Sequence, residues 1–275
     1  MLSSEEFARK TTEAKQHYDY FRYHAPEAPS AFKVLEVGTG WYPIIPLSLF
    51  LCGAEAVWTN DIEPLVNCER LRRTVQLFVE YADSGRLDAV LPDWKKERLE
   101  ALRAMAADLT ERSPAEMLSP LGFHLRVLDS QHTGLDANSI DLITSSGVLM
   151  YVPKPALEGI YREFRRTAKA GAVMIHRYNF RDIYSYFDRK ITPLNMLRFS
   201  PGAWRWLDSA VVPQNRLRVS DHRAMQQAAG FRIVAEEHDS APAEMLSRVR
   251  LAEEFRSYRE EDILALESWL ISLPV

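Results

Sequence analysis

The residues best suited to bind a ligand follow the first β-rich run of the chain, in Glu36-Val37-Gly38-Thr39-Gly40. Glycines allow the backbone to bend closely around a ligand, and the helix that follows offers free N–H groups at its N-terminus. A dinucleotide site would favour a third glycine, where this chain has Pro43. Because the Glu36 carboxylate would repel a phosphate, the segment predicts a site for a cationic ligand.

A second group of reactive side chains, His176-Arg177-Tyr178, ends a later β-rich run. Histidine is the side chain best suited to proton transfer near neutral pH, so His176 is our candidate base or acceptor contact. We expect Arg177 and Tyr178 to orient a substrate. The alternative is that His176, like His222, is a surface or hydrogen-bonded residue without a chemical role.

The elements that position these residues alternate between strands and helices. A strand, the glycine-rich turn, a helix opened by Pro43 and a strand that ends at Asp61 form the first half of a doubly wound α/β sheet. The last two of seven expected strands read as an antiparallel edge pair in a mostly parallel sheet. The expected strands lie at residues 32–37, 54–60, 124–128, 140–144, 172–176, 231–237 and 266–272.

We expect a single domain over residues 1–275, with three additions to the sheet. Residues 1–30 predict an N-terminal helix that docks on the domain or covers a ligand. Residues 83–120 are charged and spaced as a solvated helical insertion. Residues 179–218 are rich in aromatic side chains, which predicts a substrate cap; a satellite core or a dimer contact is the alternative.

Composition excludes several classes of protein. The chain has 275 residues, 47% of them hydrophobic, and 34 basic against 38 acidic residues give a net charge of −4. This excludes a strongly basic nucleic-acid binder. Two cysteines cannot form a disulfide scaffold, and the N-terminus lacks the apolar run of a signal peptide. No segment is long and apolar enough to span a bilayer, so we expect a cytoplasmic protein with no membrane partner. The charge balance likewise predicts no nucleic-acid partner.

The acid followed by Gly-x-Gly resembles the class I, Rossmann-like S-adenosylmethionine-dependent methyltransferases. Asp61 after the second strand and Asp129 after the third fall in that family's order, although Tyr42 stands where the family usually has another glycine. By this resemblance Asp61 would accept hydrogen bonds from the ribose hydroxyls and Asp129 would meet the adenine amino group. The likeness extends from Phe32 to Gly171.

The resemblance implies S-adenosylmethionine as the cofactor and assigns it a set of contacts. Gly38 and Gly40 would make room for the methionine and ribose part, and Glu36 would help to hold the amino-acid end. The residues implied in cofactor binding are Glu36, Gly38, Thr39, Gly40, Asp61, Ile62, Asp129, Ser130 and Ser146.

The predicted reaction is methyl transfer to a small-molecule acceptor, most simply an oxygen, without a metal. The loop after the fourth strand, Ser145-Ser146-Gly147-Val148, lacks both the metal-binding Asp of catechol-type enzymes and the Asp/Asn-Pro-Pro-aromatic motif of nucleic-acid amino-methyltransferases. A protein or peptide methyltransferase, a cofactor-binding partner subunit without catalysis, and a nicotinamide-dependent oxidoreductase stay open as alternatives. A homodimer is also left open.

Overall fold

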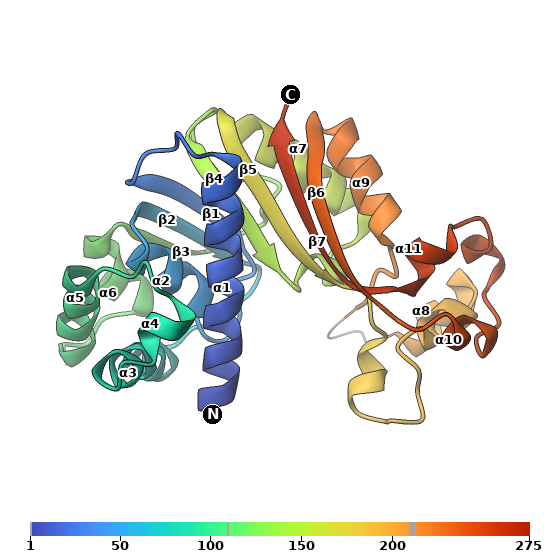
Figure 1. Cartoon of the computed structure of the whole chain (residues 1–275), viewed down its shortest axis with the longest axis horizontal. Helices are drawn as coiled ribbons and strands as arrows, with labels where there is room; N and C mark the ends of the chain where they lie inside the picture. Colours follow the sequence, from blue (N-terminus) through green and yellow to red (C-terminus); the bar gives the residue numbers. More distant parts are fainter. Residues whose placement is uncertain (1, 109, 209–212) are drawn as a thin grey trace. The chain divides into compact units, whose positions relative to one another are not determined.

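The β-rich runs of the sequence form one sheet in the computed structural model, which describes residues 2–108, 110–208 and 213–275. Within these residues the sheet has seven strands in the order β3-β2-β1-β4-β5-β7-β6 (Figure 1). This confirms the predicted doubly wound α/β sheet with its edge pair. The strands are β1 (Phe32–Val37), β2 (Ala54–Asp61), β3 (Phe123–Val127), β4 (Ile140–Ser146), β5 (Ala168–Asn179), β6 (Phe231–Ser240) and β7 (Ala265–Pro274).

The register of the first strands decides which side chains meet. β1 and β2 are parallel, with Glu36 opposite Thr59 and Val37 opposite Asn60. β2 and β3 are also parallel, with Asp61 opposite Val127. Glu36, Thr59 and Asp61 therefore lie toward the carboxyl ends of neighbouring strands, the edge at which open α/β sheets bind ligands.

The contacts of the chain divide it into two compact units. The first unit contains the residues up to Thr144, Arg166–Ile175 and Pro274. The second contains Ser145–Arg165, His176–Leu273 and Val275. Each unit is described by itself below.

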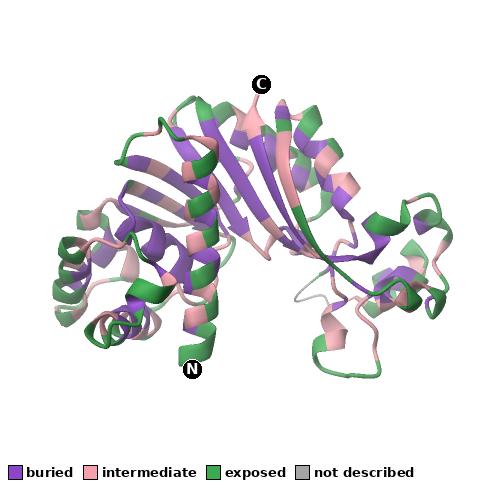
Figure 2. Ribbon diagram, viewed as in Figure 1, coloured by how far each residue is buried: buried purple, intermediate pink, exposed green. Residues whose placement is uncertain are grey.

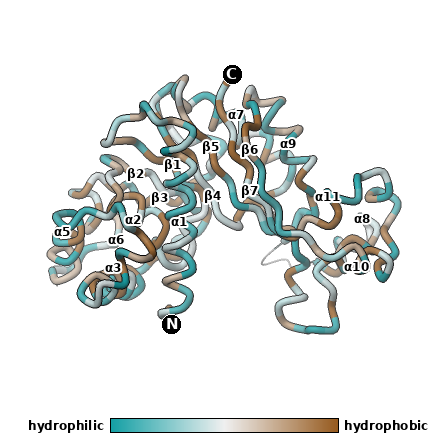
Figure 3. The backbone as a smooth tube through the Cα atoms, in the orientation of Figure 1, coloured by the Kyte–Doolittle hydropathy of each residue, from teal (hydrophilic) through white to brown (hydrophobic). Residues whose placement is uncertain are grey.

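Helices of the first unit cover its strands with apolar side chains. α1 (Ser4–His24) packs on α2 (Ile44–Leu51), and α2 in turn packs on β2. Every residue of α2 is buried, and most of them are hydrophobic (Figure 3). α3 (Cys68–Asp83) begins after Asn67, whose side chain caps the helix by accepting a hydrogen bond from the Arg70 N–H.

The predicted insertion at residues 83–120 is helical, with α4 (Leu87–Val90), α5 (Lys96–Ala107) and α6 (Pro114–Leu118). α5 packs on α3, and α6 packs on β3. Residue 109 of this range lies outside the described residues, as do residue 1 of the N-terminal segment and residues 209–212 of the predicted cap.

The second unit has two helices that follow strands of the sheet, α7 (Lys154–Thr167) and α9 (Val219–Ala228). α9 packs on β6. β7 is buried over most of its length, and Figure 2 shows the same burial along β5. The described helices include none that is long and apolar enough to cross a membrane.

The region predicted as an aromatic cap has a hydrophobic core of its own. α8 (Pro201–Leu207) contributes Trp204, which packs in a cluster with Leu194, Phe255 and Ile263. More than half of this cluster comes from residues 241–266, which include α10 (Glu244–Ser247) and α11 (Glu260–Leu264). The satellite core weighed in the sequence analysis is therefore present, and it draws on a segment that the sequence did not associate with the cap.

Candidate active site

The glycine-rich segment after β1 forms the expected bend. Gly38 and Gly40 have φ angles of 93° and 66°, in the left-handed region that favours glycine. The Gly38 N–H donates to the Asn60 carbonyl at 2.8 Å, which ties the bend to β2. A Cβ atom added to Gly40 would meet nothing within 4 Å, so the space over this residue is open to a ligand.

Asp61, at the tip of β2, turns its carboxylate toward this bend. Its Oδ2 accepts the Gly40 N–H at 2.9 Å, and its Oδ1 accepts the Glu63 N–H at 3.3 Å. A carboxylate accepts about four hydrogen bonds. Asp61 therefore retains the capacity to accept both hydroxyls of a ribose while it fixes the bend.

Glu36 is buried beneath the bend, with 2% of its surface exposed. The Thr59 hydroxyl donates to its Oε2, and the Thr39 hydroxyl bonds to Thr59 in turn. Burial raises the pKa of Glu36 to about 8, although the hydrogen bond from Thr59 lowers it. The carboxyl group is therefore mostly protonated at neutral pH and would ionise readily beside a bound cation.

Side chains at the ends of β2 and β3 offer both apolar and polar contacts. Ile62 is 70% exposed and Val127 is 55% exposed, so both side chains are accessible to the face of an aromatic base. Both oxygens of the exposed Asp129 accept hydrogen bonds from Gln131, from its N–H at 2.9 Å and its Nε2 at 2.8 Å. Ser130 is buried beside them.

A cavity of about 160 Å³ lies beside Gly40 and Asp61, wholly within the first unit. The predicted insertion supplies part of its wall, which the sequence analysis did not foresee because it read that segment as a solvated helix. The capping box of α6, in which Ser113 and Glu116 cap one another, holds this wall in place. The cavity is lined by residues 39–40, 61, 63–66, 113–115 and 125–127.

The second unit holds the remaining predicted residues. Ser145 Oγ and His176 Nδ1 are hydrogen-bonded at 2.7 Å, and His176 is fully buried. The Gly147 N–H donates to the Arg177 carbonyl at 2.8 Å, which fixes the loop that carries Ser146 against β5. An acceptor could reach His176 only after these contacts open, so its catalytic role stays a prediction.

Tyr178 belongs to a buried polar network. Its hydroxyl bonds to that of Tyr161 at 2.8 Å and accepts from Gln226 Nε2 at 2.8 Å, while His222 Nδ1 bonds to the Tyr161 hydroxyl at 3.0 Å. Burial raises the pKa of Tyr178 and lowers that of His222 to about 3. These neutral groups hold β5 to α7 and α9, and the substrate-orienting role of Tyr178 is untested.

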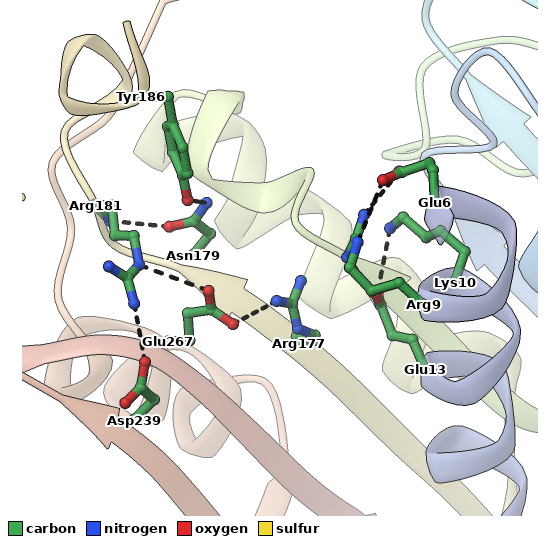
Figure 4. A network of polar contacts seen from close by, with 10 residues as sticks. All are labelled: Glu6, Arg9, Lys10, Glu13, Arg177, Asn179, Arg181, Tyr186, Asp239 and Glu267. Carbon is green, nitrogen blue, oxygen red and sulfur yellow. Dashed lines mark hydrogen bonds and ion pairs between the residues drawn. The ribbon is translucent and has the colours of Figure 1, made fainter. Parts of the chain in front are cut away.

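Arg177 points away from this network and toward a group of charged residues. It forms an ion pair with Glu267, which also lies 3.6 Å from Arg181, and Arg181 pairs with Asp239 at 2.9 Å (Figure 4). Arg177 is the least buried of the three predicted catalytic residues, with 18% of its side chain exposed.

A separate ionic group lies on α1 of the first unit. Arg9 and Lys10 each lie 3.3 Å from Glu13, a carboxylate that is 4% exposed, and Arg9 also pairs with Glu6 at 2.7 Å (Figure 4). No cluster of three or more metal-ligating side chains occurs among the described residues of the chain.

Part of the chain matches a known family. Residues 80–176 match the family model described as "Methyltransferase domain". Residues 80–176 are therefore similar to part of a methyltransferase domain. This confirms the resemblance and the enzyme class drawn from the sequence. The glycine bend at residues 38–40 precedes the matched part of this methyltransferase. No curated protein matches the sequence.

Solved structures with some similarity to the chain have low sequence identity. A candidate sarcosine dimethylglycine methyltransferase from Galdieria sulphuraria is 11% identical, with a TM-score of 0.52 over 95% of this chain and 84% of that one. An S-adenosylmethionine-dependent methyltransferase from Mesorhizobium loti is 16% identical, with a TM-score of 0.48 over 93% and 96%. A geranyl diphosphate C-methyltransferase from Streptomyces coelicolor A3(2) is 12% identical, with a TM-score of 0.49 over 96% and 79%.

Proposed function

We propose that this methyltransferase transfers a methyl group from S-adenosylmethionine to a small-molecule acceptor, with an oxygen as the acceptor atom. The observation that carries the proposal is the open space over Gly40, with the Asp61 carboxylate directly beside it and the ionisable Glu36 beneath. A positively charged sulfonium nucleoside fits these groups better than a phosphate does, because both side chains are acidic.

In this reaction the chain's own residues bind and orient the cofactor. Asp61 would accept hydrogen bonds from the ribose, Ile62 and Val127 would pack on the adenine, and Asp129 would receive its amino group. Glu36 would help to hold the amino-acid end of the ligand. The cofactor supplies an activated methyl group for in-line displacement, so the protein's contribution is alignment and the exclusion of water.

The proposal includes transfer without a metal ion and a single methyltransferase domain over residues 1–275. The Ser145-Ser146-Gly147 loop supports the first point, because it places hydroxyl groups where a metal-dependent enzyme needs a carboxylate. The roles of His176, Arg177 and Tyr178 toward the acceptor, and that of residues 179–218 as a substrate cap, stay predictions. Action on a peptide and cofactor binding without catalysis are the alternatives.

A panel of ligands tests the cofactor class. Thermal unfolding of the full chain is followed with S-adenosylmethionine, S-adenosylhomocysteine, NAD⁺ and NADH. We expect the two sulfur nucleosides to raise the Tm by several degrees, since a ligand at about 100 times its Kd stabilises the native state by about 2.7 kcal/mol. A shift with the nicotinamide ligands alone would assign the site to an oxidoreductase and overturn the proposal.

A further inference from the structure

Four large apolar side chains, on two segments of the second unit, are exposed. Trp206 is 91% exposed, Phe187 83%, Tyr186 58% and Leu207 47%. We call these four residues the aromatic patch. Single exposed apolar residues are common on protein surfaces, but a group of this size marks an interaction site.

The two segments that carry the patch adjoin one another. The Tyr184 hydroxyl donates to the Leu207 carbonyl at 3.0 Å, which joins η3 (Ile183–Tyr186) to the end of α8. Trp204 turns inward from α8, where its Nε1 donates to the Gln214 carbonyl at 3.0 Å. Trp206 lies two residues further along, about 200° around the helix, and so turns outward.

The satellite core beneath the patch does not need these rings. Its apolar side chains come from other positions, and Trp204 is the residue of α8 that belongs to it. Trp206 and Phe187 can therefore contact a partner without disrupting the satellite core.

The segment that carries the patch is opposite in charge to the whole chain. Residues 186–207 carry four basic side chains and one acidic side chain, a net charge of +3, whereas the chain carries −4. All four basic side chains are exposed, as is the acidic Asp188. The basic residues are Arg189, Lys190, Arg198 and Arg205.

We propose that the aromatic patch docks this protein on a membrane surface that contains anionic lipids. Trp and Tyr rings prefer the depth of the lipid headgroups, and Phe and Leu enter the acyl boundary below them. Basic side chains beside the rings contact the negative surface, each adding roughly fivefold to the partition coefficient. A single-stranded nucleic acid suits the patch less well, because the aliphatic Leu207 has no face on which a base can stack.

Docking of this kind is peripheral and needs no spanning segment. The expectation of no membrane partner rested on the lack of a spanning segment in the sequence. The proposal revises that expectation, and it holds whether or not the proposed methyl transfer is correct.

Vesicle co-sedimentation of the full chain tests the proposal. The vesicles consist of phosphatidylcholine with or without phosphatidylglycerol. We expect the wild type to sediment with the anionic vesicles, and the double variant Phe187→Ser/Trp206→Ser to bind at least about tenfold more weakly. Arg189→Ser/Lys190→Ser should lose the preference for phosphatidylglycerol. Tyr23→Ser, which removes a ring that is 79% exposed in the first unit, should bind as the wild type does.

The conservative variant Trp206→Phe separates insertion from a general change in structure. It should retain vesicle binding but lose the part of the blue shift in tryptophan fluorescence that the wild type shows with vesicles. Equal sedimentation of the wild type and the Phe187→Ser/Trp206→Ser variant would overturn the proposal. The proposal would also be overturned if the protein did not bind the vesicles but bound a single-stranded RNA oligonucleotide, or formed a dimer that depends on the patch.

Discussion

At the scale of single residues, the site depends on two acids in different surroundings. Asp61 lies at the tip of β2 with access to a ligand, whereas Glu36 lies one strand away with 2% of its surface exposed. Glu36 was predicted from its place before Gly38 and Gly40, and the role of Asp61 was implied by the resemblance to methyltransferases. The sequence could not predict that Thr59 stands opposite Glu36, because that contact follows from the register between two strands.

The raised pKa of Glu36 has a consequence for stability. The carboxyl group titrates near pH 8 when folded and near its ordinary value of 4.5 when unfolded. Between these values the folded protein holds a proton that the unfolded chain has lost, so the free energy of unfolding falls as the pH rises, by up to about 1.4 kcal/mol per pH unit. This stability is fully present below the unfolded pKa and is lost as the pH rises through the folded pKa.

We therefore predict that Glu36→Gln abolishes this fall in the free energy of unfolding with rising pH. The variant should gain stability relative to the wild type as the pH rises from about 5 to about 8, by a few kcal/mol in total. Urea unfolding at a series of pH values measures the difference. Glu55→Gln, which changes an exposed acid on the same strand as Thr59, should follow the wild type. A constant gap between Glu36→Gln and the wild type would show that Glu36 is ionised in the folded protein.

At the scale of elements, one arginine joins several segments of the second unit. Arg218 is fully buried and donates to the carbonyls of Phe180 at 3.0 Å and Ile263 at 2.7 Å, as well as to those of Asp262 and Ala265. The end of β5, the end of α11 and the start of β7 thus meet at one side chain. Burial lowers the pKa of Arg218 to about 10, which leaves it charged at neutral pH.

We predict that Arg218→Met destabilises the protein by about 3–5 kcal/mol, because it leaves buried carbonyl groups without donors. Arg218→Lys should recover only part of this, since an ammonium group cannot reach acceptors in a fork. Arg259→Met removes an arginine that is 81% exposed and should cost less than about 0.5 kcal/mol. Chemical denaturation measures all three variants, and equal losses for Arg218→Met and Arg259→Met would contradict the role given to Arg218.

The same scale shows where prediction from sequence works and where it stops. The predicted strand positions lie close to the observed ones, because apolar, β-branched runs in the sequence are bounded by Gly and Pro. β5 extends three residues beyond the expected end at residue 176, which makes Asn179 part of the strand. The joining of residues 241–266 to α8 was not predicted, because such long-range packing leaves no local periodicity in the sequence.

At the scale of the whole molecule, the fold and the order of the acids follow from the sequence. Which side chains are exposed to solvent does not. His176 and Tyr178 lie on the face of β5 that meets aromatic rings and α9, and alternation along a strand cannot say which face is covered. The exposure of a ring such as Trp206 could not be predicted from the sequence either, because Trp204, two positions earlier, is buried.

The central claim is that the bend at Gly38 and Gly40, with Asp61 beside it, binds a sulfur nucleoside. Isothermal titration calorimetry of the full chain with S-adenosylhomocysteine tests it most directly. We predict saturable binding by the wild type and by Glu69→Gln, an exposed acid outside the cavity lining, and affinity at least about tenfold weaker in Asp61→Asn. Absence of heat with the wild type, or unchanged affinity in Asp61→Asn, would contradict the account.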